Sequence, residues 1–117
     1  MAQMQDSILK SVQLTRGVGL NNSPFDESLL TAINTALNEL TQLGIGPEEG
    51  FVITSEEETW EDFFRGNDPR IHMAKTYVSH RVWLMFDPPQ SSTMIDAIEK
   101  TIREIEWRLT IAVPETV

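Results

Sequence analysis

The chain has 117 residues, of which 40% are hydrophobic and 23% charged, as in an ordinary globular domain. Its formal net charge of −9 opposes binding to nucleic-acid phosphates, and the absence of cysteine excludes disulfides, thiolate metal sites and a thiol nucleophile. No apolar run is long enough to span a bilayer, and residues 1–10 lack the basic and apolar regions of a secretory signal. We therefore expect one domain over residues 1–117, with flexible tails at 1–5 and 114–117, kept in a cytoplasm or in a particle assembled there.

Two helices are predicted in the first part of the chain. The first spans residues 6–15, where apolar residues recur at helical spacing behind a capping Asp6 or Ser7. The second opens with Asp26 as its cap and ends at Gly44. Its apolar residues follow one another at spacings of three and four, which is typical of a helix face that packs into a core.

The segment from residue 48 to residue 68 is the least regular and the most acidic. It holds eight acidic groups and one basic group, so it carries −7 of the net charge of −9. A short β-prone run within it is expected to be extended. Thr59 and Asp62 resemble a capping box, and the Trp60 and Phe63 that follow would tie this segment to the core.

A fourth helix, after the short third one at Trp60, is predicted to open at Asp68 and to stop near Phe86. Pro88 and Pro89 stop it, because both have a fixed φ and no amide N–H, so they form a stiff corner. Apolar residues wrap much of its last two turns. Such a helix is either central or part of an interface.

A fifth helix is predicted from Ser92 to Ala112, with an apolar seam from Ile95 to Leu109 at heptad spacing. Its outer face carries four pairs of opposite charge at spacing i, i+4, which are Asp96/Lys100, Glu99/Arg103, Lys100/Glu104 and Glu104/Arg108. The predicted fold is therefore all-α. It is a small bundle of four to five helices with a short irregular acidic loop between the second and the third.

The usual catalytic and metal-binding patterns are missing. His72 and His80 lie eight residues apart on one predicted helix and point about 80° apart, so they do not form a metal pair. There is no glycine-rich phosphate loop, and the acidic segment does not match a calcium loop. Arg70, Lys75 and Arg81 could form a basic strip, but salt bridges to the acidic segment are the favoured interpretation. We expect no catalytic residue, no cofactor and no metal.

Three short segments together point to a family. They are Gln42-Leu43-Gly44-Ile45-Gly46-Pro47, Phe86-Asp87-Pro88-Pro89 and Glu106-Trp107-Arg108-Leu109. In their order and spacing, over roughly Ile8 to Leu109, they resemble the head–tail connector (adaptor) proteins of long-tailed bacteriophages. The resemblance is closest to the small connectors of phages and prophages of Gram-positive bacteria.

The resemblance implies a structural virion protein of the neck, made in the bacterial cytoplasm. Such proteins are small helical bundles that form a homo-oligomeric ring, with twelve copies expected, beneath the portal protein after DNA packaging. They extend the DNA channel and dock a head-closure, stopper or tail-completion protein. DNA passes without sequence-specific binding, and no membrane is involved.

Two sets of site residues follow as expectations. The candidate protein-interface residues are Trp83, Phe86, Pro88, Pro89, Trp107, Arg108 and Leu109. The candidate channel-lining residues are Glu56, Glu57, Glu58, Glu61 and Asp62. The fifth helix and the residues after it are expected to face the portal.

Two other functions remain open from the residues alone. One is a non-viral helical adaptor that binds a partner helix along the Ile95–Leu109 seam. The other is a small enzyme that uses the acidic segment to hold a divalent metal.

Overall fold

The computed structural model describes residues 7–16, 27–66, 68–86 and 88–111. Five helices occur in these ranges. In chain order they are α2 (Ile8–Arg16), α3 (Glu27–Gln42), α4 (Trp60–Phe64), α5 (Ile71–Phe86) and α6 (Ser92–Ile111). The described residues contain no strand, only one isolated antiparallel bridge between Ser7 and Thr59. The all-α prediction is confirmed.

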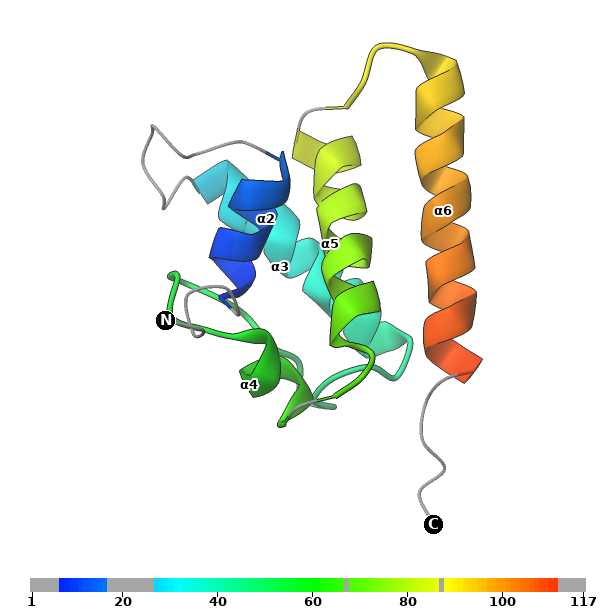
Figure 1. Cartoon of the computed structure of the whole chain (residues 1–117). Coiled ribbons are helices and arrows are strands. Elements are labelled where there is room, and N and C mark those ends of the chain that lie inside the picture. Colours follow the sequence, from blue (N-terminus) through cyan, green and yellow to red (C-terminus); the bar gives the residue numbers. More distant parts are fainter. Residues whose placement is uncertain (1–6, 17–26, 67, 87, 112–117) are drawn as a thin grey trace.

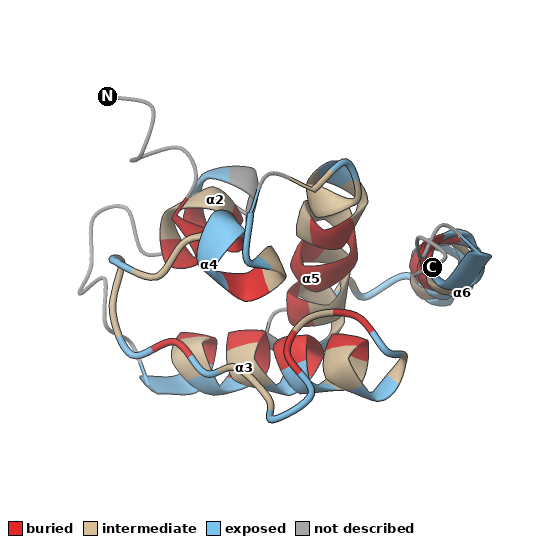
Figure 2. Cartoon of the chain, turned by 90° about the horizontal axis from the view of Figure 1, so that it is seen from below, coloured by how far each residue is buried: buried red, intermediate tan, exposed pale blue. Residues whose placement is uncertain are grey.

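Helix α5 is the centre of the bundle. It packs against α2, α3 and α4 and also against α6 (Figure 1). Figure 2 shows α2, α3 and α4 gathered on one side of α5, with α6 on the other. The side chains of Ala74, Tyr77, Val78 and Val82 are fully buried. The apolar residues on nearly all sides of α5 are therefore explained by its central position, one of the two predicted interpretations.

The helix ends agree with the sequence signals where the structure describes them. The Lys10 amide donates to Ser7 Oγ over 3.2 Å, so Ser7 caps α2. At the end of α3, Ile45 N donates to Leu40 O and Gly44 N to Thr41 O, each over 2.9 Å. This is the Schellman pattern, and Gly44 supplies the positive φ (+91°) that it requires. The predicted cap at Asp26 and the predicted helix end at Ala112 lie outside the described residues.

The extended part of the acidic segment is fastened to α3 by one side chain. Asn34 Oδ1 accepts a hydrogen bond from Ile53 N (2.8 Å), and Asn34 Nδ2 donates to Ile53 O (3.0 Å). The Asn34 amide thus takes the place of a neighbouring strand. It satisfies the two backbone groups of Ile53, whose side chain is 1% exposed.

The acidic segment is fastened a second time at α4. The capping box is confirmed, since Asp62 N donates to Thr59 Oγ1 (3.1 Å) and Thr59 N donates to Asp62 Oδ2 (3.0 Å). Trp60 and Phe63 are fully buried, and Trp60 Nε1 donates to Ser11 Oγ (3.0 Å) on α2. The short helix therefore plugs the core with two large aromatic side chains, as predicted.

Helix α6 begins after the proline corner and packs along α5. Met94 N donates to Ser91 Oγ over 3.2 Å, so Ser91 is its cap. The predicted seam is buried at four positions, which are Ile98, Ile102, Ile105 and Leu109. Burying each such side chain contributes about 1.5–3 kcal/mol, whereas a surface ion pair at spacing i, i+4 contributes only about 0.2–0.5 kcal/mol. Of the four predicted pairs, the structure brings only Arg108 and Glu104 within ion-pair distance, at 3.9 Å. The seam therefore holds α6 in place.

We predict that Gly46→Ala destabilises the fold more than Gly50→Ala, its matched control. Both glycines have positive φ, +90° and +96°. A Cβ at residue 46 would lie 2.4 Å from Phe63 Cζ in the core, whereas nothing lies within 4 Å of one at residue 50. Backbone strain costs about 1–2 kcal/mol at either site, and the overpacked ring adds about 1–3 kcal/mol at residue 46. Urea unfolding measures the free energy of unfolding of each variant. Equal decreases in the two variants would contradict the close approach of Phe63 to residue 46.

Candidate functional site

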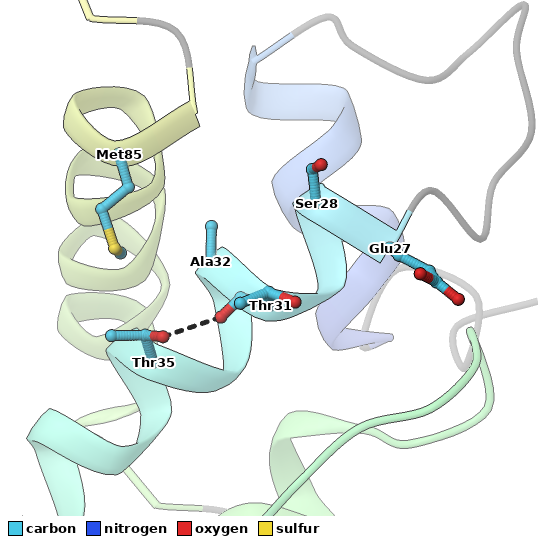
Figure 3. Close-up of a pocket in the computed structure, with 6 residues that line it drawn as sticks. All are labelled: Glu27, Ser28, Thr31, Ala32, Thr35 and Met85. Atoms are coloured by element: carbon cyan, nitrogen blue, oxygen red, sulfur yellow. Dashed lines mark hydrogen bonds between the residues drawn. The ribbon is translucent and has the colours of Figure 1, made fainter.

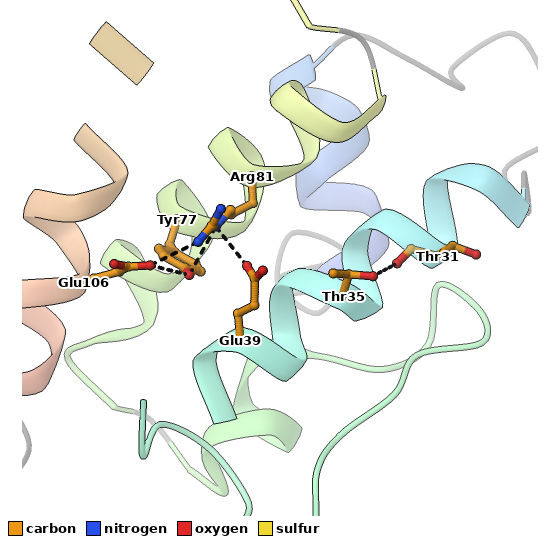
Figure 4. Close-up of polar contacts among 6 residues, drawn as sticks. All are labelled: Thr31, Thr35, Glu39, Tyr77, Arg81 and Glu106. Carbon is orange, nitrogen blue, oxygen red and sulfur yellow. Dashed lines mark hydrogen bonds and ion pairs between the residues drawn. The ribbon is translucent and has the colours of Figure 1, made fainter. Parts of the chain in front are cut away.

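A polar cluster ties α6 and α3 to the central helix (Figure 4). Arg81 of α5 lies between two carboxylates, with Nε 2.9 Å from Glu39 Oε1 and Nη2 3.2 Å from Glu106 Oε2. Tyr77 OH donates to Glu106 Oε2 over 2.9 Å and accepts from Arg81 Nε over 3.3 Å. One arginine and one tyrosine of α5 thus join three helices. We call Glu39, Tyr77, Arg81 and Glu106 the Arg81 cluster.

The electrostatics of the Arg81 cluster indicate a structural tie. Burial, aided by the hydrogen bond to Glu106, raises the pKa of Tyr77 to about 12, although Arg81 opposes the shift. Burial alone would lower the pKa of Arg81, but its hydrogen bond to Tyr77 and the charges of Glu39 and Glu106 outweigh burial and raise it. The phenol therefore stays neutral and the guanidinium charged throughout the ordinary pH range. Neither group is prepared to act as a base or a nucleophile.

The predicted salt bridges of the basic strip are partly right. Arg70 pairs with Asp68 in the acidic segment over 2.8 Å, and the hydrogen bond from the Arg70 side chain is the main reason why the pKa of Asp68 is lowered. For Arg81 the prediction is wrong, because its partners are Glu39 and Glu106. The i, i+4 spacing of Tyr77 and Arg81 was visible in the sequence. The identity of their partners depends on the packing register of three helices, which the sequence does not display.

The acidic segment divides into carboxylates that serve the fold and carboxylates that face solvent. Glu56 lies 3.3 Å from Lys10 Nζ. Burial alone would raise the pKa of Glu58, but hydrogen bonds from Thr54 and Ser55 outweigh burial and lower it. The Asp62 carboxylate belongs to the capping box.

Two candidate channel residues, Glu57 and Glu61, are exposed, and within the described residues their carboxylates form no ion pair. The same part of the chain holds no group of three or more histidine and acidic side chains that could bind a metal ion. Of the five candidate channel residues, these two are exposed glutamates without an ion pair in the described part of the chain, although Glu61 also lies in the first turn of α4, where its charge favours the helix dipole.

The candidate interface residues lie in different environments. Three of them are exposed, which are Trp107 (62%), Arg108 and Pro88. Trp83 and Pro89 are half-buried. Leu109 is fully buried against the core, so its assignment to a surface is corrected: it belongs to the seam of α6. The side chain of Phe86 lies outside what the structure describes.

The structure adds an apolar neighbour to Trp107 that is not among the interface residues expected from the sequence. Ile111, one turn further along α6, is also 62% exposed. At 100° per residue, Trp107 points about 160° away from both Ile105 and Leu109 in the seam. Trp107 therefore lies on the side of α6 that faces away from the bundle. The spacing i, i+4 between Trp107 and Ile111 was the signal that could have identified Ile111.

The comparisons with known proteins bear on what such a bundle is for. The sequence model of a family described as phage connector protein matches residues 8–116. The chain belongs to the phage connector protein family. No match to a curated protein or to a solved structure was found.

Family membership confirms the resemblance in the sequence and sets a coarse function. The connector is a structural head–tail component of the virion, in a family that is not enzymatic, and it contacts other virion components. The match begins with α2 and extends past α6, so it covers every described helix. None of the helices in the described part of the connector combines the length and the apolar character that a membrane span requires.

We predict that Tyr77 of the folded connector titrates with a pKa of about 12. Tyr77 is the one tyrosine in the sequence, so tyrosinate absorbance measures it alone. The unfolded chain should titrate near pH 10, the ordinary value for tyrosine (about 10). Because the pKa is higher in the folded state, the buried neutral phenol contributes to the free energy of unfolding. This contribution is complete below pH about 10 and is lost as the pH rises from about 10 to about 12.

A matched pair of variants tests the cause of this shift. Glu106→Gln removes the charged acceptor of the Tyr77 hydroxyl and should lower the midpoint. Glu104→Gln removes an exposed carboxylate from the same helix and should leave it unchanged. A native midpoint near 10 would contradict the burial of the Tyr77 hydroxyl in the Arg81 cluster.

Proposed function

We propose that this connector assembles into a homo-oligomeric ring, with twelve copies expected, beneath the portal protein of a bacteriophage. The ring extends the DNA channel and docks the next neck component, a head-closure, stopper or tail-completion protein. The observation that carries this proposal is the family match over residues 8–116. Helix α6 and the chain after it face the portal in this arrangement.

The distribution of exposed apolar side chains supports assembly into a ring. In a ring, one surface of a subunit meets a different surface of the next. Large exposed apolar side chains occur on separate elements, with Trp107 and Ile111 on α6, Met85 on α5 and Val52 in the acidic segment. Single exposed apolar residues are ordinary, but their presence on several sides gives a subunit more than one contact surface.

The acidic segment supports a channel wall through which DNA passes without binding. Negative carboxylates repel phosphates, so a wall that carries them discourages adhesion. In this proposal Glu57 and Glu61 line the channel, since the carboxylates of Glu56, Glu58 and Asp62 have partners within the fold.

The two other functions receive less support. The seam that a partner helix would occupy is covered by α5, because Ile98, Ile102, Ile105 and Leu109 are buried within the chain. The described acidic residues include no cluster suited to a metal ion.

The first test is the shape of the assembly. Purified connector is mixed with the portal protein of the same phage and imaged by negative-stain electron microscopy. We expect closed rings of connector on one end of the portal, because the contacts of a ring are completed only when the last subunit joins the first. Connector that neither binds the portal nor forms rings would overturn the proposal.

The second test concerns the channel. Glu57→Gln with Glu61→Gln removes two exposed charges that form no ion pair among the described residues, so the free energy of unfolding should fall by no more than about 1 kcal/mol, the most that the charge of Glu61 contributes in the first turn of α4. We expect phage carrying this double variant to lose infectivity through impaired DNA retention or ejection. Glu48→Gln with Glu49→Gln, which removes the same charge from exposed positions outside the candidate channel residues, is the matched control. Equal infectivity of both double variants and of the parent phage would remove Glu57 and Glu61 from the channel wall.

A further inference from the structure

Helix α6 carries a ridge of three exposed side chains on the side away from its buried seam. Arg103, Trp107 and Ile111 are spaced i, i+4 and i+8, so they follow one another on successive turns of one face. All three are exposed, and Trp107 and Ile111 each keep 62% of their surface in solvent. We call these three residues the α6 ridge. It joins an apolar pair to a positive charge at one end.

A groove lies between α3 and α5 (Figure 3). Its volume is about 420 Å³, and it is lined by Glu27, Ser28, Thr31, Ala32, Thr35 and Met85. Met85 is 42% exposed and reaches from α5 toward α3, where the small Ala32 leaves room beside it. Glu27, in the first turn of α3, is the one charged side chain among the described residues of this lining. We call this the α3–α5 groove.

The α6 ridge and the α3–α5 groove have the same periodicity. Arg103 to Ile111 and Glu27 to Thr35 each span eight residues of helix, or about 12 Å. Glu27, Thr31 and Thr35 are themselves spaced i, i+4 and i+8. Ridges of this spacing on two helices interdigitate in the commonest class of helix packing.

We propose that the α6 ridge of one copy of this chain docks into the α3–α5 groove of a second copy. The two helices run in the same direction, so that Arg103 lies at Glu27, Trp107 over Ala32 and Ile111 against Met85. This contact rests on the proposed function, for which it supplies the surfaces between neighbouring subunits. Because the ridge and the groove are different surfaces, each copy keeps one of each free and the contact propagates from copy to copy.

Charge complementarity favours a second copy as the occupant and sets its direction. Arg103 stands at the first turn of the ridge and Glu27 at the first turn of the groove, so the parallel arrangement joins opposite charges. The antiparallel arrangement would place Arg103 beside Met85, and the described residues that line the groove offer no acidic side chain at that end.

The remaining contacts are also matched in chemistry. The Thr35 hydroxyl donates to Thr31 O over 2.8 Å, so its oxygen can still accept. The hydroxyls beside Ala32 offer an acceptor for the indole N–H of Trp107, which requires a partner once it is buried. The Met85 thioether offers a favourable contact to an aromatic ring or an aliphatic chain. Tryptophan and arginine are also the residue types that most often dominate the binding energy of an interface.

Disulfide cross-linking tests this contact directly, because the chain has no cysteine of its own. Thr35→Cys and Ile111→Cys replace exposed side chains, so both variants should fold. When the two purified variants are mixed at high concentration and oxidised, we expect a mixed disulfide dimer. Each variant alone should give little dimer, and a mixture of Val52→Cys with Ile111→Cys is the control for random collision. A Thr35→Cys and Ile111→Cys mixture that yields no more dimer than this control would overturn the proposal.

Cross-linking, read together with the imaging of rings on the portal, distinguishes other arrangements. If Ile111→Cys alone forms the main dimer, two α6 ridges face each other and the groove is not the docking site. If rings form on the portal while the mixed disulfide does not, the proposed function stands and this contact is wrong. If the mixed disulfide forms while no ring appears on the portal, this contact stands and the ring proposal fails.

Substitutions of the ridge give an independent measurement. Trp107→Ala should weaken self-association, measured by sedimentation, by at least about tenfold, while Trp107→Phe should retain most of it. Arg103→Glu should weaken association, and mixing it with Glu27→Arg should restore it, because the reversed pair of charges is again opposite. Association that is unchanged in Trp107→Ala and in Arg103→Glu would exclude the ridge.

Discussion

The central position of α5 is the constraint on which the rest of this connector depends. A helix buried on most sides needs partners on most sides, and here they come from α2, α3 and α4 on one side and from α6 on the other. Its buried residues are consequently a mixture of large and small side chains, with Tyr77 beside Ala74 and Val78. The acidic segment joins the bundle through the Asn34 hydrogen bonds, the buried Trp60 and Phe63, and the contacts of α2 with Glu56 and Glu58, so it is an attachment to the core formed around α5.

The attachment of α6 is of a different kind. It packs on the bundle through one seam of four buried aliphatic residues, and the Arg81 cluster fixes it from the side. The seam contributes most of the free energy, because burying an aliphatic side chain is worth several times a partly exposed ion pair. The cluster fixes the register of α6 along α5, because Tyr77 and Arg81 both bind the same oxygen of Glu106.

Much of this fold could be predicted from the sequence, and what could not has a physical reason. The capping box at Thr59, the glycine that ends α3 and the period of the α6 seam are local signals, in which the deciding residues lie within a few positions of each other. The partners of Arg81 and the bond between Asn34 and Ile53 join residues that are distant in sequence. They depend on the register between elements, and periodicity alone does not specify it. Leu109 is a second case in which the sequence alone did not separate a buried residue from a surface residue. Its neighbours Trp107 and Arg108 are at the surface, and only its helical phase separates it from them.

The attachment of α6 to the bundle determines how the exposed Trp107 is presented to other molecules. A single exposed apolar side chain needs no explanation in a protein of this size. Trp107 is accompanied by Ile111 one turn away, and both lie on a helix whose opposite side is buried. The seam and the Arg81 cluster hold that helix in one orientation, so this pair is presented at a fixed angle to the bundle. A surface repeated around an assembly needs such rigidity, because an angular error in one subunit is added to that of the next. The features that attach α6 to α5 therefore also serve the surface that α6 turns outward.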